Sequence, residues 1–246
     1  MKRLFPILSV LLLICVSALA DPLPLLEDYT GEIKEDYDGG TFLFSYRYPH
    51  VDENAEGGDA INAFISQELI NYKLEFDVPI IQDVYESEGD SFSMVIDYLT
   101  TCNNDEYFSF LVKTDRMDPD QTLTYYEGYV FSRKNGGNGK TYTLPKFLGI
   151  LESNENDTWL QDRQTGKADK LIRELVWEKI RENEEGIAYY DSFTEESLEA
   201  EFFPEENFYL DENGDPVFYL QPDIAAPASF GLLTFSIPLE DILDEL

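Results

Sequence analysis

The sequence predicts an α+β protein with antiparallel sheets and a few packed helices, arranged as two small, intimately associated subdomains. Segments in which apolar and polar residues alternate come in consecutive groups separated by short turns, which is typical of antiparallel strands. Longer segments with apolar residues at helical spacing lie between these groups. Strands and helices segregated in this way favour an α+β fold over a doubly wound α/β fold.

Residues 1–20 are predicted to be a signal peptide. Lys2 and Arg3 precede a mostly apolar run, and Ala18-Leu19-Ala20 supplies the small residues of a cleavage site. The apolar run is short for a membrane span, so we expect no membrane insertion after cleavage; a signal anchor is the alternative. The expected location is therefore secreted or bound to the cell envelope of a bacterium, outside the cytoplasm.

The chain after the signal peptide begins with an acidic leader, residues 21–40, expected to be a flexible arm or an edge segment. Residues 41–120 then form the predicted N-terminal α+β domain, in which Phe42, Phe44 and Tyr46 alternate on one strand face. The predicted elements are a strand over 41–48, a helix capped by Asp59 and reaching about Lys73, an unassigned stretch over 77–88, a strand region opening at Asp90, a turn at 103–105 and a strand containing Phe108, Phe110 and Val112.

Residues 121–246 form the predicted C-terminal α+β domain. Its longest helix carries an apolar stripe from Ala168 to Ile180, with Gly186 just beyond its end. The predicted elements are a strand over 121–133, a loose turn over 135–139, a short helix from Thr143 to about Leu151, a polar loop over 153–165, the long helix capped by Thr165, a helix starting at Thr194, three strands within 208–237 and an acidic helix over 238–246.

The three strands within 208–237 organise the second domain. Asn213-Gly214 lies between two aromatic-rich segments and is a strong hairpin signal. A loop rich in proline and alanine follows, before a third apolar strand. Asp211 to Asp215 resembles the start of a calcium loop, but Pro216 and Pro222 occupy the positions that require glycine and glutamate. The stretch is therefore interpreted as a hairpin turn.

The charge of the chain is extreme. It has 50 acidic and 17 basic residues, for a net charge of -33, and loss of Lys2 and Arg3 with the signal peptide gives -35. Such a field repels nucleic acid and anionic membranes and attracts basic proteins. Two interpretations remain open: the charge keeps an exported protein soluble, or it serves a basic partner. A hydrophobic content of 43% argues against disorder.

No residue pattern predicts catalysis, a cofactor or a metal site. His50 is the only histidine, which argues against histidine metal sites and Ser-His dyads; we expect it to be an exposed structural residue. Cys102 is the only cysteine after the signal peptide and is expected to be a free or buried thiol. Carboxylates are numerous, but no spacing selects a catalytic pair. Tyr125, Tyr126 and Tyr129 are either sheet residues or a binding face.

A series of short motifs, each at one place, follows in order along residues 41–246. They are Tyr46-Arg47-Tyr48-Pro49, Ile61-Asn62-Ala63-Phe64-Ile65, Gly139-Lys140, Thr143-Leu144-Pro145-Lys146-Phe147, the helix from Leu171 to Ile180, Phe208-Tyr209-Leu210, Ile224-Ala225-Ala226-Pro227 with Gly231, and Ile237-Pro238-Leu239. This order resembles the tandem extracellular domains of RsiV-type anti-sigma factors and of the non-catalytic N-terminal region of PdaC-type peptidoglycan deacetylases.

The chain departs from that resemblance at two places. The related second domain has a Gly-Gly-Ala-His type of turn before its Gly-Lys turn, whereas Met117 to Thr124 stand there and include no histidine. The loop near Ile224 often has a tyrosine after the proline, whereas Asp223 follows Pro222. Both departures weaken the transfer of individual contacts from the related proteins.

The resemblance implies a non-enzymatic binding module at the cell envelope that recognises a basic protein such as a lysozyme. The contact loop would then contain Pro222, Asp223, Pro227, Ser229 and Phe230. The alternative is an accessory protein that binds peptidoglycan or wall glycan, which would need aromatic platforms. Trp159 and Trp177 do not supply one, because the patterns place them in a loop and a helix. A degrading enzyme is a third class that the missing motifs disfavour, and no pattern indicates the oligomeric state.

Overall fold

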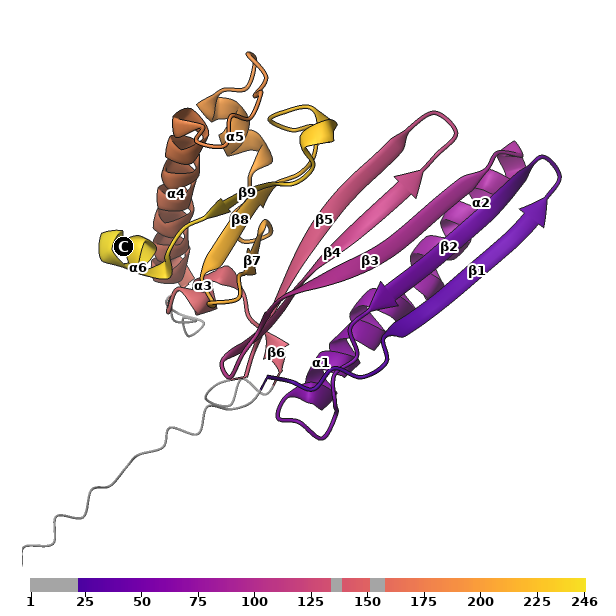
Figure 1. The fold of residues 1–246 in the computed structure, drawn as a ribbon, viewed down its shortest axis with the longest axis horizontal. Coiled ribbons are helices and arrows are strands. Elements are labelled where there is room, and N and C mark those ends of the chain that lie inside the picture. The colour runs from indigo at the N-terminus through magenta and orange to yellow at the C-terminus, as the bar shows by residue number, and fades with distance from the viewer. Residues whose placement is uncertain (1–21, 134–138, 151–157) are drawn as a thin grey trace, which may run out of the picture.

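The computed structural model describes residues 22–133, 139–150 and 158–246. The predicted signal peptide, the loose turn over 135–138 and the first part of the predicted polar loop lie outside these residues. The described chain contains a six-stranded sheet and a three-stranded sheet together with helices, which confirms the α+β class (Figure 1).

The larger sheet has the strand order β1-β2-β3-β4-β5-β6. Alternation predicted β2 to β5 well, and of the two alternatives for the acidic leader the edge segment is observed as β1. The division expected at 120/121 falls in the turn between β4 and β5, two neighbours in this sheet. The strands are β1 (Tyr29–Tyr37), β2 (Gly40–Tyr48), β3 (Phe92–Asn103), β4 (Tyr107–Met117), β5 (Thr122–Ser132) and β6 (Lys140–Thr141).

One strand pair differs from the antiparallel arrangement that we expected. β2 and β3 run parallel, with Phe42 opposite Phe92 and Tyr46 opposite Ile96. A parallel pair needs a long crossover, and the helical segment over residues 58–88 supplies it. The expectation failed because the helical segment carries the chain back to the end of the sheet at which β2 began.

The crossover is one continuous helical segment made of α1 (Gly58–Phe64), two π-helical stretches η1 (Ile65–Asn71) and η2 (Lys73–Asp77), and α2 (Val78–Glu88). It extends well past Lys73, where we expected the helix to end, and takes in the unassigned stretch. Asp59 is not the cap either: Gly57, with φ 83°, occupies that position, and no side chain caps the helix. Pro79 has no N–H to donate, and it lies at the start of α2, directly after the second π-helical stretch.

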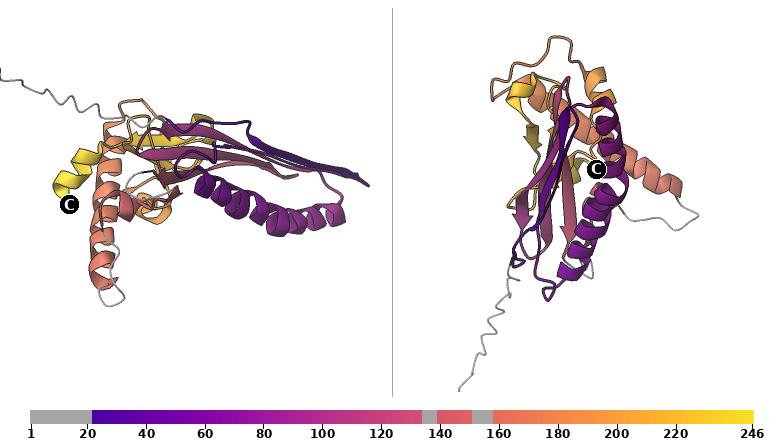
Figure 2. Two further views of the ribbon diagram at one scale, coloured as in Figure 1. Left: turned by 90° about the horizontal axis from the view of Figure 1, so that it is seen from below. Right: turned by 90° about the vertical axis from the view of Figure 1, so that its right-hand side faces the viewer.

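The helical segment covers one face of the large sheet (Figure 2). The core between them contains aromatic side chains from β2, β4 and β5 packed against the buried side of the helix. Phe42, Phe108, Phe110 and Phe131 are fully buried there, opposite Ile61 and Ile65. The alternation predicted for β2 and β3 is thereby confirmed, because the alternate residues of each strand are the ones that enter this core.

The remainder of the chain builds the three-stranded antiparallel sheet β7-β8-β9 and the helices around it. The hairpin predicted around Asn213-Gly214 and the closing acidic helix are confirmed. Its elements are α3 (Leu144–Phe147), α4 (Thr158–Glu182), α5 (Glu195–Glu201), β7 (Phe208–Leu210), β8 (Pro216–Leu220), the short 3₁₀ helix η3 (Ala228–Phe230), β9 (Leu233–Ser236) and α6 (Leu239–Glu245).

The predicted start of α5 is confirmed, whereas the predicted start of α4 is wrong. Thr194 caps α5 as expected, in a reciprocal capping box with Ser197. The long helix α4 begins at Thr158 and not at Thr165, so Trp159 belongs to a helix and not to a loop. Thr165, the predicted cap, and Gly166 are both interior residues of this helix, and Gly166 has open space around it.

The two sheets are joined at β5 of the larger sheet, on the face opposite the crossover helix. A Cβ atom on Gly128 would come within 2.0 Å of the Phe208 carbonyl oxygen, so only glycine allows this contact. The backbone N–H of Gly128 also donates to the hydroxyl of Tyr219 at 3.0 Å. On β4, Ser109 Oγ accepts from the backbone N–H of Leu210 at 3.1 Å. Backbone contacts and buried hydrogen bonds thus fix the two sheets together.

Among the helices of the described ranges, none combines the length and the apolar character that crossing a membrane would require.

Candidate functional site

The candidate site is built around the loop of residues 221–232, which connects β8 to β9. Two of its residues have left-handed backbone angles, Asp223 with φ 68° and Gly231 with φ 70°. Gly231 ends the 3₁₀ turn η3 and allows the chain to enter β9. Asp223 is a residue type that tolerates this region, since its short side chain can form local hydrogen bonds.

Hydrogen bonds hold the first half of the loop in one conformation. The amide of Gln221 pairs with the backbone of Tyr126 on β5: Gln221 Nε2 donates to the Tyr126 carbonyl at 2.7 Å, and the Tyr126 N–H donates to Gln221 Oε1 at 2.9 Å. The hydroxyl of Tyr190 donates to the Asp223 carboxylate, which raises the pKa of that tyrosine. The N–H of Tyr190 donates to the Ala225 carbonyl at 2.9 Å. The loop is therefore preorganised, which lowers the entropy cost of binding a partner.

The five residues proposed from the sequence differ in their exposure. Ser229 and Phe230 are exposed, and Phe230 presents 42% of its surface to solvent. Pro222 and Pro227 are half-buried, and Asp223 is exposed but held by Tyr190. The structure therefore brings all five into one surface loop and leaves Ser229 and Phe230 as the side chains most open to a partner.

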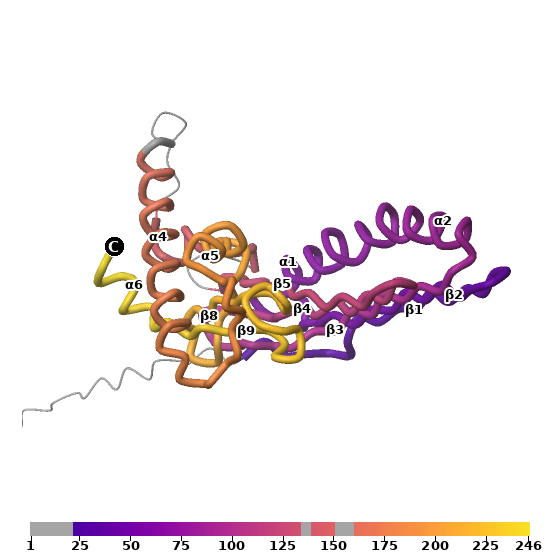
Figure 3. The backbone as a smooth tube through the Cα atoms, turned by 90° about the horizontal axis from the view of Figure 1, so that it is seen from above, coloured from indigo at the N-terminus to yellow at the C-terminus, as the bar shows by residue number. Residues whose placement is uncertain are grey.

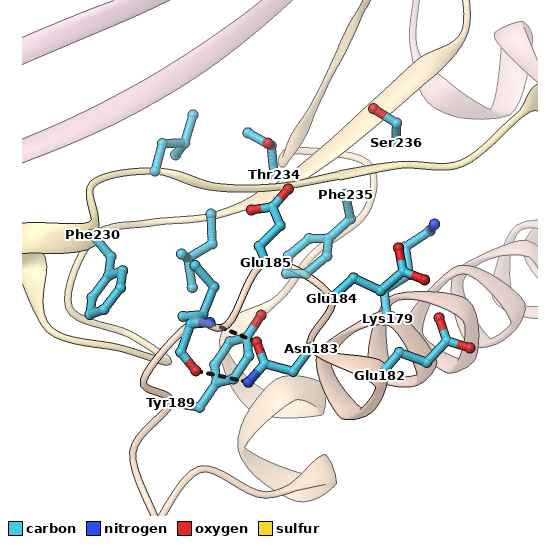
Figure 4. Close-up of a pocket in the computed structure, with 13 residues that line it drawn as sticks. Lys179, Glu182, Asn183, Glu184, Glu185, Tyr189, Phe230, Thr234, Phe235 and Ser236 are labelled. Carbon is cyan, nitrogen blue, oxygen red and sulfur yellow. Dashed lines mark hydrogen bonds between the residues drawn. The ribbon is translucent and has the colours of Figure 1, made fainter.

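A pocket of about 290 Å³ adjoins the loop at Phe230 (Figure 4). Its walls come from three segments far apart in the sequence: the end of α4 with the residues after it, η3, and β9. The lining residues are Lys179, Glu182, Asn183, Glu184, Glu185, Ile187, Tyr189, Phe230, Leu232, Leu233, Thr234, Phe235 and Ser236. β9 is the outermost strand of its sheet, so the pocket lies beside a strand with no neighbour on that side.

The end of α4 shapes one wall of this pocket. Asn183 follows the last helical residue with φ 45°, the left-handed conformation common at helix ends. Its side chain closes the turn: Asn183 Nδ2 donates to the Ile187 carbonyl at 2.9 Å, and the Ile187 N–H donates to Asn183 Oδ1 at 2.7 Å. Figure 4 shows this pair of bonds beside the tyrosine ring. The turn fixes the backbone between two pocket carboxylates, Glu182 and Glu185.

The electrostatics of the pocket are negative. Three glutamates and one lysine line it, together with the aromatic rings of Tyr189, Phe230 and Phe235. Burial raises the pKa of Tyr189, and the nearby negative charge of Glu185 raises it further. Carboxylates beside aromatic faces suit a lysine or arginine side chain, which gains an ion pair and a cation–π contact.

A second cavity, of about 560 Å³, lies between α3 and the first half of α4 and is lined in part by Thr143, Lys146, Asp169 and Glu205. Burial raises the pKa of the Asp169 carboxyl, an effect that Arg173 opposes. Burial also raises the pKa of Glu205, and the charge of Asp169 adds to that shift. This cavity therefore holds two carboxyl groups whose pKa values are raised by burial.

The other residues singled out in the sequence have structural roles. His50 is half-buried and not exposed as expected, because its ring stacks on Tyr29 at 4.3 Å. Cys102 is buried, and burial raises the pKa of its thiol to about 11. Asp211 Oδ1 accepts from the N–H groups of Asn213 and Asp215, as the hairpin interpretation predicts.

The tyrosines of β5, Tyr125, Tyr126 and Tyr129, are half-buried sheet residues. In the three described ranges, no group of three or more histidine, cysteine or acidic residues is arranged to hold a metal ion.

Sequence reasoning found the loop but missed the acidic wall of the pocket. Glu182, Glu184 and Glu185 were interpreted only as the end of a helix. The one signal in the sequence is the run of carboxylates directly before the stretch Ile187 to Tyr190. Pairing that run with β9 requires the fold, because some fifty residues separate the two segments.

Comparison with known proteins places a recognised domain over this site. Residues 162–240 match the sequence model of a family described as "Protein of unknown function (DUF3298)", so a DUF3298 domain is present there. The match runs from α4 to the start of α6 and includes the loop and the pocket. No curated protein matches the chain.

Two solved structures match the chain over most of its length. One is the crystal structure of a DUF3298 family member from Bacteroides fragilis NCTC 9343, with 12% sequence identity and a TM-score of 0.55 over 90% of this chain and 94% of that chain. The other is a DUF3298 family protein from Pseudomonas aeruginosa PAO1, with 12% identity and a TM-score of 0.48 over 92% and 94%. At such identity the first likeness is one of fold alone.

Proposed function

We propose that this chain is an exported, non-enzymatic binding module of a bacterial cell envelope, and that it recognises a basic protein of the lysozyme kind. The resemblance of its motif order to the extracellular domains of RsiV-type anti-sigma factors and of PdaC-type deacetylases supports this function. The net charge of -33 supports it independently, because such a charge accelerates association with a basic partner.

The observation that carries the proposal is the position of Phe230. This exposed ring lies on a preorganised loop, at a pocket lined by Glu182, Glu184 and Glu185. A partner that inserts a lysine or arginine there would contact both an aromatic face and carboxylates. Aromatic anchors of this kind commonly dominate the binding energy of an interface.

The test is binding of purified residues 21–246 to a lysozyme at low and at high salt, with an unrelated basic protein of similar charge as control. We expect binding that persists at high salt and is specific for the lysozyme. If salt abolished the binding, or if the control protein bound equally well, the charge would serve solubility only. Binding to insoluble peptidoglycan in place of lysozyme would favour the wall-glycan alternative.

The contact surface is tested by Phe230→Ala. We expect at least tenfold weaker lysozyme binding, since a buried aromatic anchor contributes about 2 kcal/mol or more. The matched control is Phe203→Ala, which removes a phenylalanine that is 48% exposed and lies outside the loop and the pocket. Equal affinities for the two variants would show that the loop is not the contact.

The role of the acidic wall is tested by the double variant Glu184→Gln and Glu185→Gln. Its matched control is Glu199→Gln with Glu201→Gln, which changes the charge by the same amount on α5. We expect the first pair to slow association and to reduce the salt dependence more than the second pair. Identical kinetics for both double variants would assign the effect to net charge and not to the pocket.

A further inference from the structure

The outer side of the crossover helix carries a row of large apolar residues. Tyr72, Phe76, Ile80 and Val84 have between 46% and 67% of their surfaces exposed, and they follow one another at intervals of four residues. We call these four residues the outer stripe. The rings of Tyr72 and Phe76 lie 5.2 Å apart, so the first two members are in contact along the helix.

The π-helical stretches keep this row straight. In an α-helix residues four apart drift steadily around the axis, because a turn holds 3.6 residues. In η1 and η2 the bonds close over five residues: the Tyr72 N–H donates to the Gln67 carbonyl, and the Val78 N–H donates to the Lys73 carbonyl. Such wider turns offset the drift, so residues spaced by four stay on one line.

Within the described residues, the outer stripe stays exposed and does not pack against the sheet. The sheet is contacted by the opposite side of the segment, where Ile65, Leu69, Val78 and Tyr85 are buried. Figure 3 shows the helical segment lying over the sheet, with none of the labelled elements on its far side. Single exposed apolar residues are ordinary, whereas four in a continuous row mark an interaction surface.

The charges beside the outer stripe identify the kind of partner. The exposed ionisable residues on the same segment are mostly acidic: Glu68, Glu75, Asp83, Glu86 and Glu88, against the half-exposed Lys73. A second copy of this chain would bring two such acidic surfaces together, and each chain has a net charge of -33. An anionic lipid surface would be repelled in the same way. A basic partner is the one that this acidic surface attracts.

We propose that the outer stripe binds a cationic amphipathic helix. The apolar face of that helix would pack along Tyr72, Phe76, Ile80 and Val84, and its lysines or arginines would pair with carboxylates beside the stripe, such as Glu75 and Asp83. This site lies on the N-terminal half of the chain, outside the DUF3298 domain and apart from the loop at Phe230. The inference therefore stands or falls independently of the lysozyme proposal.

The probe is a synthetic peptide of about 18 residues made of leucine and lysine in amphipathic helical order, a length that covers the stripe. We expect it to bind the full chain and to become helical on binding, as circular dichroism would show. A scrambled peptide of the same composition keeps the charge but has no apolar face, and we expect it to bind at least tenfold more weakly. Equal binding of both peptides would overturn the proposal in favour of charge alone.

The surface is located by the double variant Phe76→Ser with Ile80→Ser, for which we expect at least tenfold weaker peptide binding. The matched control is Leu99→Ser, which changes a residue of the sheet that is 64% exposed. A second double variant, Glu75→Gln with Asp83→Asn, leaves the apolar residues in place and should weaken binding several-fold. Peptide affinity that is unaffected by both double variants would overturn the proposal.

Two further measurements test whether something other than the peptide occupies the outer stripe and whether the peptide binds at the loop and pocket. Concentration-dependent dimerisation that Phe76→Ser with Ile80→Ser abolishes would replace the peptide by a second copy, and binding to anionic vesicles would replace it by a lipid surface. Phe230→Ala should leave peptide affinity unchanged. If that variant abolished peptide binding, the peptide would occupy the loop and pocket, and the outer stripe would not be its site.

Discussion

The side chain of Asp169 lowers the stability of the folded protein. One of its carboxylate oxygens, Oδ1, is buried and has no hydrogen-bond partner within the part of the chain that the structure describes. Desolvation raises the pKa of this carboxyl, and Arg173 offsets only part of the shift. At neutral pH the folded state therefore holds a carboxylate in surroundings that favour the protonated acid.

Asp169→Asn should stabilise the protein at neutral pH. A carboxyl whose pKa is raised in the folded state destabilises that state increasingly as pH rises from the unfolded pKa of about 4 to the folded pKa, and the effect is absent below the unfolded pKa. The gain should be at most about 1 kcal/mol, because the side chain is partly solvated and its charge is screened.

Urea unfolding of both proteins at pH 7 and at pH 4 measures this difference. The gain should be present at the higher pH and small at the lower pH. Asp162→Asn on the same helix changes an exposed carboxylate and should leave stability unchanged at both. A larger gain at pH 4 than at pH 7 would contradict the assignment.

Residue identities predicted the loop but not these electrostatic details. Pro222 to Phe230 stood out by composition, and the structure gathers them at one surface. Nothing near Asp169 in the sequence distinguishes it from Asp162, since burial depends on α3 and on Glu205, which reach it only in the fold. Asp223 likewise looked like a free contact residue, whereas Tyr190 already binds it.

At the scale of elements, the contact between β5 and β7 depends on one glycine. Gly128→Ala should destabilise the protein by about 3 kcal/mol, because its Cβ would meet the backbone carbonyl of Phe208 and neither strand can move freely. Chemical denaturation gives the free energy of unfolding of the variant and of the parent.

Gly166→Ala is the matched control for that substitution. It changes an interior residue of α4 with open space around it, and we expect a gain of about 0.5–1 kcal/mol from helix propensity. If both variants lost similar stability, the close approach of β5 and β7 would not be the cause.

Elements whose apolar residues follow a clear spacing were predicted from the sequence, whereas features that depend on contacts with distant segments were not. Alternation was enough for β2 to β5, and the capping residue for α5. The parallel pairing of β2 with β3 leaves no mark on either strand, because it depends on where the crossover helix returns the chain. The π-helical stretches were missed because apolar residues four apart also fit an ordinary α-helix, so the sequence pattern does not reveal the wider turns.

Over the whole molecule, neighbouring residues of β5 belong to different cores. Phe131 enters the core under the crossover helix, whereas Val130 enters the core built by α4 and the small sheet. Cys102 on β3 also belongs to the second core. If the large sheet unfolded on the side of one core, the buried residues of the other core would also be exposed. The stabilities of the two halves of the chain are therefore coupled.

We therefore expect a single cooperative unfolding transition. Trp177 packs against the second core, so its fluorescence reports on the C-terminal half, and far-UV circular dichroism reports on the whole chain. The two signals should give coincident denaturation curves. Two separated transitions would contradict the coupling through β5.

The parallel seam between β2 and β3 also sets an order of assembly. The β1–β2 hairpin and the β3–β4–β5 meander contain only pairings between strands that are adjacent in sequence. Phe42 of β2 can pair with Phe92 of β3 only after the whole crossover has brought the two strands together. Until the seam closes, β2 presents an unpaired edge on which other chains could add. The carboxylates of β1, on Glu32, Glu35 and Asp36, keep such chains apart, so the acidity protects the protein before the fold is complete.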